Sequence, residues 1–591
     1  NMPSDMKRAS LRTNVDYSDD KLSFALSSNL AYTRRNFQSN ELNAFATFVN
    51  PFFVPMVTPD YIGVRKPDGT YNTGVGIVYS GPTQLDKTQY DKVYNDQIKT
   101  TISTSVNYNF TKNFYAGLTA GLDFRHTSNT TYNDPRVYDT YTNSNVRIRT
   151  GSMSEGYTRF LTVNSRVFAG YKNTFANDHD MDVTVYGEYL AGYNKALNAL
   201  AYGIDPRRPN TFAGVTVGNA SNQLFHNASG GKSQNKLMSA LTTARYTFQK
   251  KYTLTGSYRY DGTSKLPKQN RFKGFWSAGA IWDLMKENFM SNVGAFQSLR
   301  LKASYGQSAN ADNFPFGDFG YLPLYNTQAN LTSGLVGIIP NVSSPGNPNA
   351  DWEYTNTLNI GIDFAMLRNR LYGDVQVYDK RTNNLFAQLS LSATGGPFGN
   401  VDVNAGSMYN RGIEYNLNYD VIKTRDLTWT VNVNGAYNKN RITDLGGITS
   451  FELGTTLIAV GKPIGTHFEV GWAGVDAATG APLYYDLDGK TTPVYSASNR
   501  TMGHGTFIPP YTGGFGTSLR YKGFDFSAFF NYAAGHKILN NWEYFLESPN
   551  FLGAGINQAR SLNFWQKPGD RASSASPLYQ NQFTSKLIQD A

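Results

Sequence analysis

The chain consists of alternating segments that come in pairs, and this pairing constrains its fold more than any other feature. Within residues 253–261, apolar, glycine and aromatic positions alternate with polar ones, which is the period-two pattern of a β-strand. Residues 114–125 and 427–437 repeat the pattern. A short polar turn, such as Ser18–Asp20, closes each pair, and a longer connection leads to the next pair. The sequence therefore predicts an all-β protein.

About 16 strands in eight pairs are expected. We predict strands at residues 8–17, 21–37, 93–110, 114–131, 156–175, 180–195, 236–248, 252–262, 271–284, 299–307, 352–365, 369–383, 407–421, 427–439, 511–521 and 524–538. A short helix is expected at Glu41–Phe48, inside the first long connection. Short turns at one rim and long loops at the other are typical of outer-membrane barrels, in which the short turns face the periplasm.

Composition agrees with one large membrane barrel. No stretch approaches the roughly 18 consecutive apolar residues of a membrane helix, and the mean hydropathy is -0.44. A barrel strand needs only every second residue apolar, so its hydropathy signal is weak. Aromatic residues make up 14% of the chain and charged residues 17%, which suits strands with one apolar and one wet face. We predict a single transmembrane antiparallel β-barrel domain over residues 1–591, with long extracellular loops and short periplasmic turns.

Several function classes find no support in the residues. The chain has no cysteine and six scattered histidines, so no metal, cofactor or catalytic site is predicted. Its net charge of +10 comes from dispersed basic residues, which does not favour a nucleic-acid partner. Asp486 and Asp488 fit part of a calcium loop, but the closing glutamate is missing, and a plain Asp-Gly turn is the favoured interpretation.

The alternation also assigns faces. We expect the following side chains to face lipid: Leu118, Leu122, Ile360, Val431 and Phe526. We expect these to face the lumen: Thr119, Asp123, Arg300 and Asn432. Aromatic residues in the long connections are candidates for stacking on sugar rings or holding peptide side chains, although loop packing is the favoured interpretation for each one alone: Tyr132, Tyr138, Tyr141, Tyr321 and Tyr325. The connections at 38–90, 132–156, 196–233 and 308–350 are expected at one rim.

A family resemblance rests on several ordered stretches between about residue 236 and 590. They include YTLTGSYRYDGTSK, RFKGFWSAGAIWDLMKENFM, SLRLKASYGQSAN, EYTNTLNIGIDF, GWAGVDAATGAPLYYDLDGK and YTGGFGTSLRYKGFDFSAFFNYAAGHKI. In these stretches the chain resembles the barrel of SusC/RagA-type TonB-dependent outer-membrane transporters.

The resemblance implies an active importer of oligosaccharides or peptides in a Gram-negative outer membrane of the Bacteroidetes type. It also implies a SusD-like surface lipoprotein as a lid, energy from the TonB–ExbB–ExbD system, and contact with outer-membrane lipid. Proteins of that family have a plug domain, a TonB-box and 22 strands; the chain departs from this pattern, since neither plug nor TonB-box is found in it. Two alternatives remain: an outer-membrane barrel enzyme that acts as a hydrolase at the loop rim, or a passive porin.

Strand parity leads to an expectation about the sheet edges. Asn1–Ser10 has no apolar signal-peptide core, so either the chain is cytosolic or its natural N-terminus lies upstream, and we favour the second. If the short turns are periplasmic, the chain starts and stops at the extracellular side. About three strands would then be absent at each side of a 22-stranded barrel. Arg8–Tyr17 and Phe524–Ile538 are therefore expected to be unpaired edges of the sheet.

Overall fold

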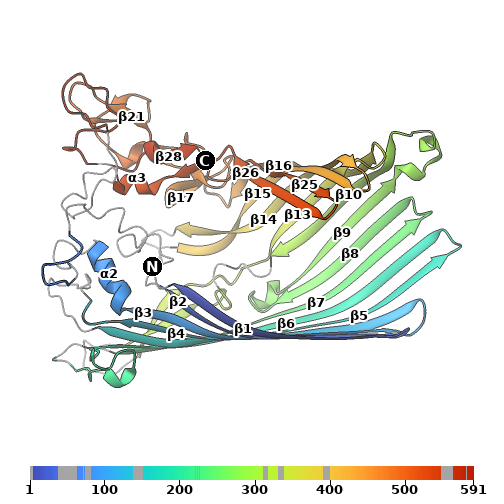
Figure 1. Ribbon diagram of the computed structural model, residues 1–591, viewed down its shortest axis with the longest axis horizontal. Coiled ribbons are helices and arrows are strands. Elements are labelled where there is room, and N and C mark those ends of the chain that lie inside the picture. Colours follow the sequence, from blue (N-terminus) through green and yellow to red (C-terminus); the bar gives the residue numbers. More distant parts are fainter. Residues whose placement is uncertain are drawn as a thin grey trace.

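A computed structural model of the protein describes residues 4–37, 63–70, 72, 81–137, 151–219, 221, 224, 226–310, 314, 317–329, 338–390, 400–546, 563–580 and 582–590. Its main element is one antiparallel sheet of 16 strands whose spatial order follows the sequence. The sheet curves into most of a barrel (Figure 1). The all-β architecture predicted from alternation is confirmed.

Most strands of this sheet are longer than their predicted parts, and a few are shorter. They are β1 (Asp5–Ser18), β2 (Leu22–Phe37), β3 (Lys92–Asn109), β4 (Phe114–Asn133), β5 (Ser152–Phe175), β6 (His179–Tyr202), β7 (Asn227–Phe248), β8 (Tyr252–Thr263), β9 (Phe272–Asp283), β10 (Phe296–Asn310), β13 (Glu353–Met366), β14 (Leu371–Ser390), β15 (Asn400–Lys423), β16 (Leu427–Leu445), β25 (Tyr511–Tyr521) and β26 (Phe524–Ala534).

Most connections alternate between short and long, and successive connections lie at opposite rims (Figure 1). An exception is the β9–β10 connection, residues 284–295, which lies at the short-turn rim and is longer than the β8–β9 connection, residues 264–271, at the other rim. Several short turns reverse direction through consecutive left-handed residues. Ala176 and Asn177 have φ of 47° and 66°, and Gln249 and Lys250 have φ of 51° and 55°. Two such residues match the twist of a tight hairpin. The predicted short turns are thus present, and the predicted long connections lie at the opposite rim.

Smaller elements occupy connections at both rims and the C-terminal region. The strands are β11 (Leu324–Ala329), β12 (Ile338–Ser344), β17 (Ser450–Leu453), β18 (Thr456–Ala459), β19 (Thr466–His467), β20 (Glu469–Val470), β21 (Trp472–Val475), β22 (Pro482–Tyr485), β23 (Thr491–Thr492), β24 (Arg500–Thr501), β27 (Lys537–Leu539) and β28 (Ile588–Asp590). The helices are α2 (Gly81–Tyr90), α3 (Asn541–Leu546) and the 3-10 turns η2 (Phe212–Gly214), η3 (Lys268–Asn270), η4 (Leu284–Lys286), η5 (Asn288–Met290), η7 (Ala497–Asn499) and η9 (Ser585–Leu587). Among the described residues, none of these helices is long and apolar enough to span a membrane.

Several predicted boundaries need correction, among them the following. The strand expected over residues 524–538 stops at Ala534, because Gly535 has φ of 79° and turns the chain. Residues 537–539 instead form β27, which pairs with β28. The connection expected over residues 196–233 is shorter, since β6 continues to Tyr202 and β7 begins at Asn227. The helix expected at Glu41–Phe48 lies outside the described residues.

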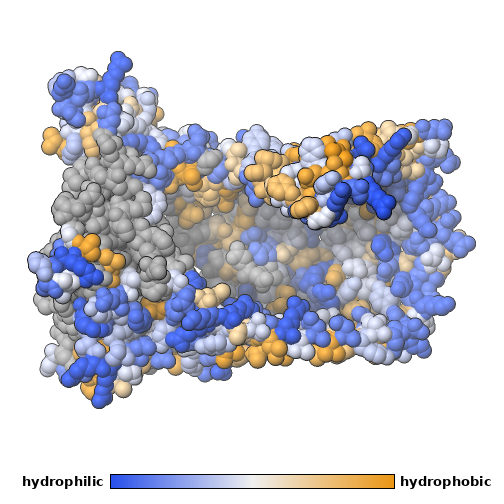
Figure 2. Space-filling view, viewed as in Figure 1, coloured by the Kyte–Doolittle hydropathy of each residue, from blue (hydrophilic) through white to orange (hydrophobic). Residues whose placement is uncertain are grey.

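The sheet has two edges, β1 and β26, as predicted. Among the described residues, β1 joins the sheet through β2 and β26 through β25. The space-filling view looks through the gap between these edges into a hollow interior (Figure 2). The number of strands that complete the barrel stays a prediction.

Most fully buried apolar side chains lie where long connections fold back onto strand ends. One cluster contains Leu266, Phe275, Phe314, Ala350 and Trp352. A second contains Tyr132, Met153 and Ile204, and a third contains Ile442, Leu445 and Ile458. The wall between the rims is one sheet thick. Its stability therefore depends mainly on the backbone ladder.

Candidate functional site

The strand register separates two faces over the whole sheet. Residues directly paired across antiparallel strands lie on the same face, so a face can be followed from strand to strand. Ile360, for instance, pairs with Ala303 and Val377, and Val431 pairs with Thr517. Followed in this way, the ladder places on one apolar face all five residues predicted to face lipid: Leu118, Leu122, Ile360, Val431 and Phe526.

The other face is polar and carries the residues predicted to face the lumen: Thr119, Asp123, Arg300 and Asn432. The register establishes that the two sets lie on opposite faces. Which set meets lipid and which lines the lumen stays a prediction.

Ion pairs join nearby strands on the polar face, and one of them spans an intervening strand. Arg166 Nε donates to Glu188 Oε1 at 2.6 Å, and an Arg259 guanidinium nitrogen lies 2.7 Å from Glu188 Oε2. Arg259 Nε also donates to Asp261 Oδ1 at 2.6 Å, and Nη2 donates to Ser239 Oγ at 2.9 Å. Two cations and two carboxylates therefore balance within one network across β5, β6 and β8.

Further ion pairs lie along the polar face. Lys99 Nζ lies 3.2 Å from Asp123, and Lys302 pairs with Asp363. Each of these two lysines contacts a carboxylate on the adjacent strand, while Arg125 lies directly opposite Lys99 and adds a further positive charge.

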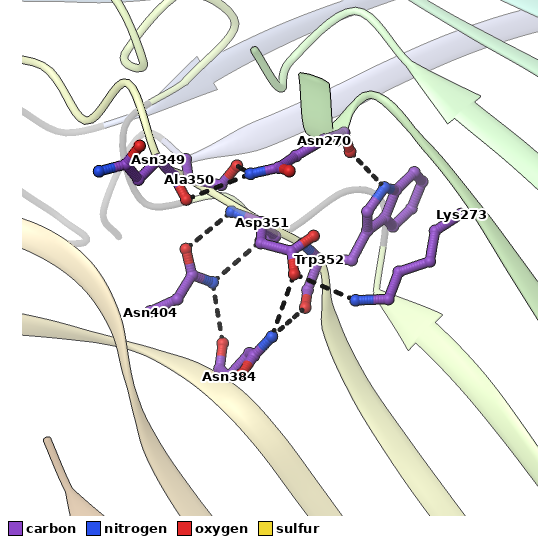
Figure 3. Close-up of polar contacts among 8 residues, drawn as sticks. All are labelled: Asn270, Lys273, Asn349, Ala350, Asp351, Trp352, Asn384 and Asn404. Atoms are coloured by element: carbon purple, nitrogen blue, oxygen red, sulfur yellow. Dashed lines mark hydrogen bonds and ion pairs between the residues drawn. The ribbon is translucent and has the colours of Figure 1, made fainter. Parts of the chain in front are cut away.

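At the long-connection rim, the residues just before β13 make hydrogen bonds and an ion pair with four other residues, Asn270, Lys273, Asn384 and Asn404 (Figure 3). The Asp351 backbone N–H donates to Asn404 Oδ1 at 2.8 Å, and Asn404 Nδ2 donates back to the Asp351 carbonyl at 2.9 Å. Lys273 Nζ lies 3.1 Å from Asp351 Oδ2. Asn384 Nδ2 on β14 also donates to Asp351 Oδ2, at 3.3 Å.

Trp352 anchors the same junction through its ring. The side chain is 1% exposed and contacts Phe275 and Phe314 edge-on, with ring centroids 5.7 and 6.4 Å apart. Its indole Nε1 donates to the Asn270 carbonyl at 3.0 Å. A buried tryptophan with a satisfied N–H and a surrounding polar network fixes the position of this connection above the wall.

The aromatic ligand candidates fall into different environments. Tyr132 is 1% exposed, packs with Met153 and Ile204, and donates its hydroxyl to Asp134 Oδ2 at 3.0 Å. Its ring offers no stacking surface in this conformation. Tyr321 is half-buried against the Trp352 cluster.

Three further candidates have no described side-chain position. Tyr325 lies in β11, while Tyr138 and Tyr141 lie outside the described residues. Ligand contact by any of these tyrosines stays a prediction.

The aspartates considered for calcium form a turn. Asp486 Oδ1 accepts the backbone N–H groups of Asp488 and Lys490 at 3.0 and 2.8 Å, and Gly489 has φ of 78°. This is the Asp-Gly turn favoured above. Across the part of the chain that the structure describes, no three His, Cys, Asp or Glu residues are grouped to hold a metal ion.

A titratable group in the β16–β25 connection escaped the sequence analysis. Glu469, on β20, is buried, and burial raises the pKa of its carboxyl to about 7, opposed by nearby Arg500. His504 Nε2 lies 3.1 Å from the Glu469 carbonyl oxygen, and burial lowers the pKa of this imidazole. The two residues are 35 positions apart in the sequence, so no local motif predicts that they lie close together.

The family model described as TonB dependent receptor-like, beta-barrel matches residues 56–569. TonB-dependent receptor P26 of Formosa agariphila is 31% identical over 317 residues, covering 50% of this chain and 31% of the relative. TonB-dependent receptor SusC of Bacteroides thetaiotaomicron is 30% identical over 349 residues, covering 56% of this chain and 33% of the relative. The chain thus spans about a third of the length of these two proteins.

A solved structure with the same fold is the one described as the RagAB peptide transporter. It superimposes with a TM-score of 0.87 at 23% sequence identity, covering 100% of this chain and 64% of that chain.

Proposed function

Since the chain belongs to the TonB dependent receptor-like β-barrel family, we propose that it forms most of the wall of an active importer in a bacterial outer membrane. The observation that carries this proposal is the continuous 16-stranded sheet with one apolar and one polar face. A closed barrel with such faces satisfies its backbone in lipid and encloses a wet passage.

The resemblance to SusC/RagA-type proteins is confirmed by the family match and by SusC itself. The prediction that the chain is not an enzyme agrees with these findings, because the matched family and the curated relatives are receptors. The hydrolase alternative is therefore dropped.

The energy source and the lid are those that the resemblance to the SusC/RagA-type family implies. Import is driven through TonB–ExbB–ExbD, acting on a plug in the whole protein, and a SusD-like lipoprotein covers the long-connection rim. Two features support the second point. The long connections gather at one end (Figure 1), and the Trp352 junction fixes one of them above the wall. The relatives come from Formosa and Bacteroides, which favours an outer membrane of the Bacteroidetes type.

The cargo is an oligosaccharide or a peptide. The wall's paired charges, such as Arg166 with Glu188 and Lys302 with Asp363, reduce the local field that could select a strongly charged solute. Hydrogen-bonding groups in a balanced field suit neutral or zwitterionic cargo. The RagAB neighbour is described as a peptide transporter, so peptides belong in any screen beside glycans.

The test uses the full-length gene in its own host. A deletion strain and its complemented parent are supplied with labelled oligosaccharides and peptides, and uptake is measured with and without a protonophore. We expect at least one cargo whose uptake needs both the gene and the proton gradient, and co-purification of a surface lipoprotein. Uptake that persists under the protonophore, together with a large steady conductance in planar bilayers, would instead establish a passive porin.

A further inference from the structure

The apolar face of the sheet contains a hollow of about 750 Å³ across β8, β9, β10, β13 and β14. Two neighbouring rows of the ladder form it. One row contains Tyr252 and Trp282, and the next contains Leu254, Ala280, Ala303 and Ile360 in adjacent strands. These side chains all point to the face that also carries Leu118 and Val431.

The sequence explains the depth of this hollow. Ala280 and Ala303 form its floor, while the larger Leu254 and Ile360 stand on either side. Toward the short turns, the rings of Tyr252 and Trp282 are stacked at 6.3 Å. Aromatic side chains at this level are typical of the membrane interface. On the predicted assignment of this face to lipid, the hollow starts at the interface and extends into the apolar part of the wall.

The short-turn rim below the hollow is basic. Lys250 and Lys251 directly precede Tyr252, and Lys286 follows Trp282 by four residues. Arg368 and Arg370 lie in the turn between β13 and β14.

Two carboxylates offset part of this charge. Glu287 lies 3.5 Å from Lys251, and Asp283 lies 3.5 Å from Lys286. A third carboxylate, Asp420, interacts with Arg370 and pairs with Lys423. The five cations therefore still exceed the carboxylates near them, and Lys250, Arg368 and Arg370 are exposed.

We propose that the hollow binds an acyl chain of an anionic phospholipid, with the phosphate held against the basic rim. An empty apolar hollow would forfeit dispersion contacts with its lining, and an acyl chain is the apolar group that a membrane supplies. Basic side chains close to the head-group layer select anionic lipid. Charge complementarity therefore identifies the occupant as a phospholipid of the leaflet on the short-turn side. This site is separate from cargo passage and does not depend on what is imported.

Tryptophan quenching tests the site in the full-length protein. The protein is reconstituted in phosphatidylcholine vesicles, and phosphatidylglycerol brominated in its acyl chains is titrated in, beside brominated phosphatidylcholine. A Trp282→Phe variant identifies the part of the signal that reports on the hollow. We expect saturable quenching of Trp282. The apparent affinity for phosphatidylglycerol should exceed that for phosphatidylcholine by a factor of about five for each basic side chain that contributes.

Two sets of variants separate the hollow from the rim. Ala280→Leu with Ala303→Leu fills the hollow, and Ala240→Leu is the control on the same face outside it. Filling should abolish saturable quenching, whereas the control should retain it. Lys250→Gln with Arg368→Gln should keep quenching but reduce the preference for phosphatidylglycerol at least fivefold.

Equal quenching by the two lipids would overturn the proposal. So would saturable binding retained in the filled variant. If filling the hollow changes the oligomeric state and leaves lipid quenching intact, the occupant is another protein surface and the lipid assignment is wrong.

Discussion

The wall and the long-connection rim are stabilised in different ways. In the wall, neighbouring strands are joined by an almost uninterrupted backbone ladder, and few side chains are fully buried. At the rim, Trp352, Tyr132 and Ile442 are each the centre of a buried cluster. The wall is thus specified by the alternation of apolar and polar side chains along each strand. Any apolar residue of suitable size maintains this alternation on the apolar face. The rim depends on particular side chains meeting across distant segments. A single substitution that maintains the alternation should therefore cost little stability in the wall, whereas a single substitution at the rim should cost much more.

The largest expected effect is at the rim. Trp352→Ala removes a buried ring and its indole hydrogen bond, and we expect a loss of about 3 to 5 kcal/mol in local stability. Hydrogen exchange should show faster opening around residues 266–275, while the strand centres stay protected. Trp276→Ala, whose side chain is 49% exposed on the apolar face, is the control and should cost much less. Equal costs would remove the distinction between rim and wall.

The second effect tests the two faces of the wall. Ile360→Lys places a charge on the apolar face and should cost about 2 to 4 kcal/mol in a bilayer. Asn359→Lys, one residue away on the polar face, should cost little. Urea titrations of refolding into lipid vesicles measure both values. A penalty at Asn359 as large as that at Ile360 would contradict the predicted lipid and lumen assignment.

The third effect concerns pH at the rim. The pKa of the Glu469 carboxyl rises from 4.5 to about 7, so the folded β16–β25 connection binds this proton more tightly than the unfolded chain does. The stability that this carboxyl contributes is therefore fully present below about pH 4.5 and is lost as the pH rises from there through about 7, by at most about 3 kcal/mol.

Limited proteolysis of this connection between pH 5 and 8 follows the change. Glu469→Gln should flatten the profile, whereas Asp488→Asn, at an exposed position of the same connection, should leave it intact. An unchanged slope in Glu469→Gln would assign the pH dependence to another group.

The smallest effect is at the short turns. Asn177 has φ of 66°, a left-handed conformation that a β-branched residue adopts at a cost of about 1 to 2 kcal/mol. Asn177→Val should destabilise the β5–β6 hairpin by this amount, while Asn177→Gly should be almost neutral. Refolding yields of the two variants in vesicles provide the comparison. A neutral valine would show that the turn has an alternative conformation of equal stability.

The sequence predicted the parts of this fold that depend on local chemistry. Alternation and short polar turns identified the strand pairs, because both signals lie within a few residues. The ends of strands were harder. Residues 227–235, NASGGKSQN, have the composition of a loop, yet they form the first part of β7 because β6 provides a pairing edge. Tertiary pairing overrides propensity at such positions.

The rim was the least predictable part. Phe275, Phe314 and Trp352 come from three separate segments, and nothing in their flanking residues signals that they meet. The same holds for Glu469 and His504. Of the ligand candidates, Tyr132 was selected for its place in a Tyr- and Asn-rich connection, but it ends a strand and is buried there. A long connection can present its aromatic residues or bury them, and composition does not distinguish the two.

Because the strand order equals the sequence order, assembly of the sheet can proceed by local steps. Every strand finds its partner next to it in the chain, so contact order stays low for so large a sheet, which favours rapid pairing. The longest intervals, between β2 and β3 and between β16 and β25, add little closure cost, since that cost grows slowly with loop length. Insertion can therefore advance hairpin by hairpin, and an error in one hairpin delays only the pairing steps that follow it.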